Sequence, residues 1–247
     1  MMSLTTANPA EIVKKQYFFK LKANIDAFSS LLGIQLLAIL FSLGATSSIS
    51  SNNNGFSIDI KYYSADVVIA FTMIWSFVTA ITITTKPYRH NDFTFVTNRI
   101  TSSISNMLFL LTASIIGGVT AMLAKNATVI LTSIFLHSEL YGPVFQVKEF
   151  IIGLFVSILY IYFISSLGYL IGTLVQVNKA LTFLLPVLII GSLFIDGMAG
   201  KEPTIMHIFQ FYFMEPSLLI FTLKAIATTA LLFIASIAIL NRMEVRK

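Results

Sequence analysis

The sequence predicts an all-α integral membrane protein with six transmembrane helices, and three observations lead to this fold class. Only 11% of the 247 residues are charged and 56% are hydrophobic, with a mean hydropathy of +0.85. A water-soluble domain carries about 25% charged residues, so lipid must cover much of this surface. Six apolar segments approach the roughly 20 residues that a helix needs to cross a bilayer. Two amphipathic stretches of helical period precede the first span and follow the second.

The six predicted spans form a transmembrane domain over residues 27–240, after a segment 1–26 and before a basic tail 241–247. They cover residues 27–49, 65–85, 105–124, 150–175, 180–195 and 217–240. The fifth contains Pro186 and Gly191, which favour a kinked helix braced by its neighbours. Segments 127–137 and 205–214 are apolar but too short to cross, and we expect each to be a re-entrant or interfacial helix.

The distribution of lysine and arginine predicts the orientation. If the N-terminus is cytoplasmic, eleven of the sixteen basic residues fall on the inner side and five on the outer side. Because basic residues accumulate in cytoplasmic segments, we expect both termini to be cytoplasmic. No cleavable signal peptide is expected, because the first long apolar run begins only at Ala27 or Phe28.

The first predicted helix lies before the spans. Asn8 can cap it, Pro9 suits its first position, and Glu11 stands where a capping-box partner would. Apolar residues then recur every third or fourth position, at Val13, Tyr17, Leu21, Ile25 and Phe28, while Lys14, Lys15 and Lys22 fall mostly on other faces. This pattern is typical of a basic amphipathic helix on a lipid surface. The same residues would also serve as a simple positive-inside anchor.

The second amphipathic stretch lies between the second and third spans. Pro87 ends the preceding helix, and Asn91 or Asp92 can cap a new one. A stripe of helical period follows at Phe93, Val96, Ile100 and Ile104, with Phe95, Asn98 and Arg99 off the stripe. Two interpretations remain open: a short helix docked on the membrane that offers its other face to a partner, or a solvated loop.

The sequence lacks the residues that several kinds of chemistry require. The chain has no cysteine, and its three histidines lie in different connections, so disulfides, thiol catalysis and a metal site are not expected. No phosphate-binding glycine loop and no protease or hydrolase motif occurs, and we expect no enzymatic activity, cofactor or nucleic-acid partner for this chain. Lys224, about two turns into the last span, either lines a cavity or reaches back to the interface.

Small and hydroxyl-bearing residues mark possible helix contacts. Ala113, Gly117 and Ala121 align on one face of the third span, and Gly168 and Gly172 on the fourth, which lets helix backbones approach closely. The fourth span also carries hydroxyl groups, at Ser157, Tyr160, Tyr162, Ser166 and Tyr169. These either line a path for an amphipathic substrate or join helices by hydrogen bonds.

The order of these parts resembles the membrane subunits of type-2 ABC exporters, especially the small six-span bacterial permeases. Such subunits begin with an amphipathic elbow helix, as in "NPAEIVKKQYFFKLKANIDAF", and carry a cytoplasmic coupling helix between spans two and three, as in "RHNDFTFVTNRITSSISN" over about 89–104. An outer re-entrant segment precedes their last span, as "IMHIFQFYFMEP" does here. The resemblance covers nearly the whole chain, and segment 127–137 departs from it.

The resemblance implies a function and partners. The chain would form a translocation path as a dimer with a second permease chain, driven by a separate ATPase subunit that binds the ATP and Mg. It would lie in the bacterial cytoplasmic membrane and export an amphipathic or antimicrobial peptide, a drug or a lipid-like molecule. Its ATPase contacts would come from Asp92, Phe93, Phe95, Val96, Asn98 and Arg99, and its elbow helix would use Lys14, Lys15, Tyr17, Phe18 and Lys22.

Two other functions fit the same composition. A six-span substrate-binding subunit of a vitamin importer would also lack ATPase motifs, but it would bind a small ligand as a single chain. A membrane scaffold or sensor partner that transports nothing would show no dependence on ATP. Association with an ATPase separates the exporter from the scaffold.

Overall fold

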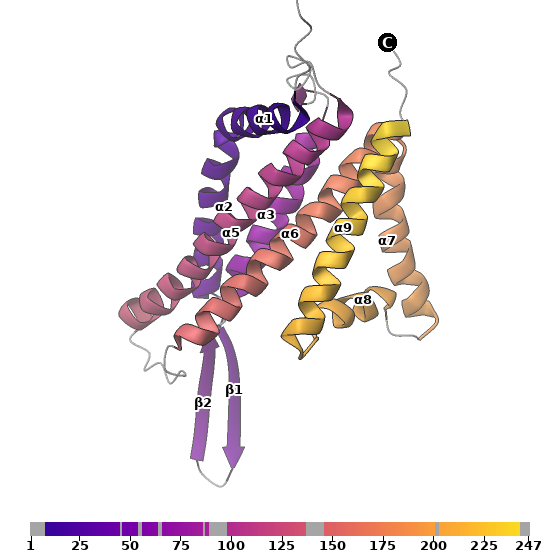
Figure 1. Cartoon of the computed structure of the whole chain (residues 1–247). Helices are drawn as coiled ribbons and strands as arrows, with labels where there is room; N and C mark the ends of the chain where they lie inside the picture. The colour runs from indigo at the N-terminus through magenta and orange to yellow at the C-terminus, as the bar shows by residue number, and fades with distance from the viewer. Residues whose placement is uncertain are drawn as a thin grey trace, which may run out of the picture.

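A computed structural model describes residues 8–44, 46–53, 56–63, 66–85, 87–88, 98–136, 146–200 and 203–242. The elements in these ranges are α1 (Pro9–Ala23), α2 (Ile25–Gly44), β1 (Thr46–Asn53), β2 (Phe56–Tyr63), α3 (Asp66–Thr84), α5 (Arg99–Leu136), α6 (Val147–Val177), α7 (Leu181–Met198), α8 (Thr204–Phe213) and α9 (Leu218–Arg242) (Figure 1).

Six of these helices are long and apolar enough to cross a membrane: α2, α3, α5, α6, α7 and α9. Each overlaps one predicted span, so the prediction of a multi-pass helical membrane protein with six spans is confirmed. Residues 205–214, expected to be helical, lie almost entirely within α8. The described ends of the chain, at the start of α1 and the end of α9, lie at the same end of the bundle (Figure 1).

The prediction of an all-α fold is wrong in one place. Strands β1 and β2 pair antiparallel, with Ile49 opposite Ile60, and the hairpin projects from the end of the bundle opposite α1 (Figure 1). Helix α2 accordingly ends at Gly44 rather than continuing to Ile49. The cause is local: serine-rich alternation and an Asn-Asn-Gly sequence favour a hairpin, whereas the average hydropathy of the span hid the change of period.

The third span is longer than predicted. Helix α5 continues for 38 residues, so the segment expected as a separate interfacial helix from residue 127 forms its last turns as far as Leu136. Lys125 does not interrupt it, because its side chain pairs with Asp66 on α3 at 3.2 Å and the helix has no proline to break it. The first turns of α5 also include residues 99–104, which were expected to end a separate short helix. Residues 89–97 lie outside the described part of the chain.

The centre of the bundle is α3, which packs against α2, α5 and α6. Glycines on α6 permit the closest approach. A Cβ added at Gly168 would lie 2.6 Å from the carbonyl oxygen of Phe77, and one at Gly172 would overlap the hydroxyl of Thr84. The buried core follows α3 along its length, from Val68 near one end to Ile83 near the other.

Helix α7 is peripheral. It contains Pro186, and none of its described residues is buried, so the expectation that neighbours brace this span is not met within one chain. Its apolar side chains are instead widely exposed, with Phe183 at 79% and Phe194 at 69%. In Figure 1 α7 stands at the edge of the bundle, and α8 lies across the gap between the ends of α7 and α9. This surface needs lipid or another protein to cover it.

Candidate functional site

The end of the bundle that carries α1 holds a junction between α1 and α5. Asn8 caps α1 by accepting a hydrogen bond from the amide of Ala10 at 3.1 Å, and α1 then crosses the ends of the spans (Figure 1). Lys20 of α1 is only 4% exposed. Its ammonium donates to Ser105 Oγ at 2.8 Å and Asn106 Oδ1 at 2.5 Å. Because a buried ammonium is costly without hydrogen-bond acceptors, this junction fixes α1 on α5.

Further polar residues lie along the same face of α1. Gln16, Lys20 and Asn24 recur every four residues and are all buried. Tyr17 shares a hydrogen bond of 2.8 Å with Thr112 of α5. The amide of Gln16 is fully buried without a hydrogen-bond partner among the described residues. The inner face of α1 is therefore polar, which sequence reasoning missed because it followed the apolar stripe. The signal was present as polar residues at i, i+4 and i+8.

Two more contacts join helix ends at this side of the bundle. Arg99, at the start of α5, donates to the carbonyl oxygen of Leu240 in the last turn of α9 at 2.5 Å. Gln176 of α6 donates to the carbonyl of Thr84 at the end of α3. Exposed carbonyls at a helix C-terminus attract such donors. Together with Lys20, and with the hydrogen bond from Asn106 of α5 to Tyr169 of α6, these contacts connect α1, α3, α5, α6 and α9 into one base, which we call the α1-end base.

The predicted partner-binding residues are only partly described. Asp92, Phe93, Phe95 and Val96 lie outside the described residues. Asn98 is exposed, and its carbonyl accepts from the amide of Ser102 at 3.1 Å as α5 begins. Arg99, also a predicted ATPase contact, has a half-buried side chain that binds α9, because the C-terminal carbonyls of α9 lie within reach.

Of the predicted elbow residues, four are exposed and one is bound. Lys14, Lys15, Phe18 and Lys22 point away from the bundle, with Phe18 51% exposed. Tyr17 faces α5, as described above. An exposed row of cations and an aromatic ring suits a lipid headgroup surface.

The small residues of α5 and α6 lie at helix contacts. Ala113 packs with Leu31 and Trp75, and Ala121 with Ala38 and Val68. A Cβ at Gly117 would lie 3.2 Å from the side chain of Thr72. The two glycines of α6 meet α3, as described above. Close packing therefore occurs on two sides of α3.

Of the five hydroxyl-bearing residues singled out on α6, two bind within their own helix and three contact other helices. Ser157 and Ser166 are buried and donate to carbonyls of their own helix. Tyr169 is buried and accepts from Asn106 Nδ2 at 3.3 Å, and Tyr162 packs on Phe233. Tyr160 donates to the carbonyl of Tyr212 at 2.9 Å.

A second polar network lies inside the membrane and was also missed. Gln35 of α2 is 4% exposed, and its amide donates to Thr72 Oγ1 at 3.1 Å and Thr120 Oγ1 at 3.0 Å. Each partner hydroxyl donates in turn to a carbonyl of its own helix. This network joins α2, α3 and α5, and it gives the side-chain amide of Gln35 in the first span hydrogen-bond partners inside the bundle.

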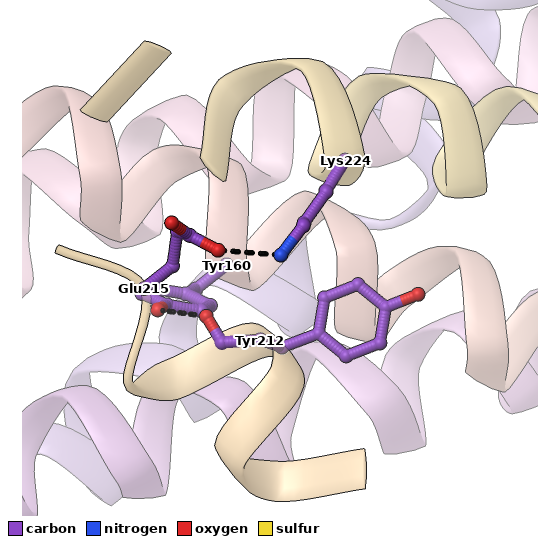
Figure 2. Close-up of polar contacts among 4 residues, drawn as sticks. All are labelled: Tyr160, Tyr212, Glu215 and Lys224. Atoms are coloured by element: carbon purple, nitrogen blue, oxygen red, sulfur yellow. Dashed lines mark hydrogen bonds and ion pairs between the residues drawn. The ribbon is translucent and has the colours of Figure 1, made fainter. Parts of the chain in front are cut away.

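At the opposite end, α8 is held by an ion pair within a group of aromatic rings (Figure 2). Lys224 of α9 lies 2.5 Å from Glu215, which follows α8, and the two side chains are 24% and 16% exposed. The ammonium of Lys224 also lies 3.9 Å from the ring centre of Phe211. In this structure a carboxylate and an aromatic face therefore hold the ammonium of Lys224.

The rings around this pair connect α8 to α6 and α9. Tyr160 stacks on Phe213 with ring centres 4.6 Å apart, and it also contacts Phe221 at 4.6 Å. Phe163 stacks on Tyr212 at 4.8 Å. The first amide of α8, at Thr204, donates to the carboxylate of Asp196 from α7. Helix α8 is thus attached to all three neighbouring helices.

Among the described residues, no group of three or more histidine or acidic side chains is placed to hold a metal ion. Scans against protein-family models, curated proteins and solved structures found no match to this chain. The sites are therefore interpreted from their own geometry.

Proposed function

We propose that this chain is the permease subunit of an ABC exporter, which works as a dimer of permease chains and is driven by a separate ATPase subunit. The observation that carries the proposal is the α1-end base. It ties α1 and the start of α5 together immediately beside the segment that the sequence predicts to contact an ATPase. A push on that segment would move several spans together, because rigid-body motion follows packed and hydrogen-bonded elements.

The peripheral position of α7 supports the dimer. An unburied span with a proline and many exposed apolar side chains is consistent with a second permease chain as well as lipid. The scarcity of ionisable residues at the span centres favours energy from an ATPase over ion coupling. From the resemblance to small six-span permeases we infer an amphipathic cargo, a peptide, drug or lipid-like molecule, and a location in the bacterial cytoplasmic membrane with both termini inside.

The test is whether an ABC ATPase co-purifies with the tagged chain from its native membranes, followed by an ATPase assay. The variant Phe93→Ala with Phe95→Ala should reduce recovery of the ATPase by at least about tenfold, a loss of about 1.4 kcal/mol in binding. Arg99 is left unchanged, because its substitution would break the contact with Leu240. The matched control is Phe155→Ala, which removes an exposed ring from α6, away from both α7 and the predicted ATPase contact. Full ATPase recovery with the double variant would contradict the proposal.

A further inference from the structure

A groove opens between α2 and α3 near the α1 end of the bundle, with a volume of about 360 Å³. This volume falls within the range of small-molecule pockets. Asp26 and Tyr88 stand at the end nearest α1, and Ile34 and Ile74 at the deeper end. Eight residues separate Asp26 from Ile34 on α2, so the groove runs about 12 Å along the helix axis.

The chemistry of the wall changes along the groove. Near α1 its side chains include Asn24, Asp26, Thr82, Ile83 and Tyr88, then Ser30 and Thr79 follow, and the deepest aliphatic side chains are Ile34, Ile74 and Val78. Trp75 lines the groove, and its indole N–H donates to the carbonyl of Ala27 at 3.2 Å and to Ser30 Oγ at 3.0 Å. The polar group of Trp75 is therefore satisfied by protein. The gradient from polar to apolar matches a molecule with one head and one tail that lies in the membrane leaflet on the α1 side.

The head end carries a negative charge. Asp26 supplies the carboxylate among the described lining residues, and it is exposed in the first turn of α2. The rings of Tyr88 and Trp75 belong to the same wall. The ammonium of Lys20 lies in the small neighbouring cavity, where Ser105 and Asn106 hold it. A carboxylate with aromatic rings nearby favours an organic cation.

We propose that this groove binds a single-chain cationic amphipath from the leaflet on the α1 side, with the cation beside Asp26 and the tail along Val78 and Ile74. The proposal rests on the exporter function only in treating this ligand as cargo, because binding itself needs no ATPase. If the chain binds no ATPase but the groove binds the amphipath, only the exporter function fails. If the chain binds an ATPase but the groove binds no amphipath, only the groove proposal fails.

The chain carries its own reporter, since Trp75 is its single tryptophan. The full chain is placed in vesicles of phosphatidylcholine and titrated with dodecyl amphipaths brominated in the tail, which quench indole fluorescence on contact. The heads are trimethylammonium, sulfate and phosphocholine. We expect the cationic probe to give saturable quenching at a concentration about tenfold lower than the other probes. This difference is what the combined binding free energy of a partly exposed ion pair and a cation–π contact predicts.

Two variants locate the site. Asp26→Asn should remove the preference for the cationic head while the tail still quenches, and this exposed substitution leaves the packing intact. Val78→Phe should fill the groove and abolish saturable quenching. The matched control, Leu37→Phe, adds the same ring to an exposed position of α2 that does not line the groove, and it should bind as the unaltered chain does.

Three outcomes would overturn the proposal. One is equal quenching by all three heads. Another is quenching that Val78→Phe leaves unchanged, which indicates contact with bulk lipid. The third is equally strong, saturable quenching by brominated phosphatidylglycerol, which would assign the groove to an ordinary two-chain phospholipid.

Discussion

At the scale of single residues, the pair of Lys224 and Glu215 shows how a membrane helix tolerates charge. Each side chain is mostly buried, so removal of one leaves the other charge uncompensated, which costs more than an exposed pair contributes. The same pair anchors α8, which has few other polar contacts with α9.

We expect Lys224→Met to lower the free energy of unfolding by about 3 kcal/mol, because it leaves the Glu215 carboxylate buried among aromatic rings. The measurement is denaturant unfolding of the purified chain, followed by helical circular dichroism. Lys148→Met serves as the control, since Lys148 is exposed at the start of α6. The exchange Lys224→Glu with Glu215→Lys should recover part of the loss. If the exchanged chain is no more stable than Lys224→Met, the ion pair is not what stabilises this end.

Glycines provide a second test at this scale. Gly172→Ala should cost about 2 kcal/mol, since the new Cβ overlaps Thr84 and lies 3.2 Å from the Cα of Ile81. Gly191→Ala is the matched control, because nothing lies within 4 Å of a Cβ built there. That substitution should be neutral or slightly stabilising, because alanine has the higher helix propensity. Equal effects of the two changes in thermal unfolding would show that α3 and α6 are not in close contact.

At the scale of elements, α1 behaves as part of the bundle rather than as a separate surface helix. Its polar face is buried against α5, while its cations and Phe18 remain exposed. Lys20 contributes three hydrogen bonds to this attachment, because its ammonium donates to neutral oxygens of Ser102, Ser105 and Asn106.

We expect Lys20→Met to loosen α1 from α5, because the hydrogen bonds of the ammonium are lost. The readout is the rate at which a thiol reagent modifies Gln16→Cys, a buried position on the same face, in a chain that has no other cysteine. The rate should rise by at least about tenfold, equivalent to 1.4 kcal/mol in the opening equilibrium. Lys22→Met removes the same charge from an exposed position of α1 and should leave the rate unchanged. A similar rise with both variants would mean that overall charge, not the junction, holds α1.

Hydropathy predicted the six spans well, because long apolar runs have few alternatives to a membrane helix. It failed where the period or the length changed within an apolar region, at the hairpin after Gly44 and in the extension of α5 to Leu136. The buried polar face at Lys20 could not be predicted, because its acceptors come from residues 102–106, far along the chain. The groove beside Trp75 likewise depends on how α2 and α3 pack.

At the scale of the whole molecule, helix α7 differs from the other spans because none of its described residues is buried. Its exposed apolar side chains extend along its length and around its circumference, from Phe183 to Met198. Lipid alone can cover them, and so can a second copy or a related chain. The proposed dimer predicts that at least one face of α7 contacts protein.

Single cysteines at residues 187–190 of α7 cover one helical turn and therefore every face. In native membranes, oxidation should cross-link copies of the chain at one or two of these positions and not at the others, as a fixed interface requires. Covalent dimers are measured on denaturing gels. If no position cross-links, or all do so weakly and equally, α7 faces lipid or a different chain.

The length of α5 has a mechanical consequence. At 38 residues the helix is about 57 Å long, nearly twice the thickness of a bilayer core. One of its ends is joined to α1 and α9 through Lys20 and Arg99, and the other lies on the hairpin side, where Lys125 pairs with Asp66. If α5 turned as a rigid rod by about 10° about the first end, the second end would move by about 10 Å. A small movement of α5 at one face of the membrane would then produce a larger displacement at the other face.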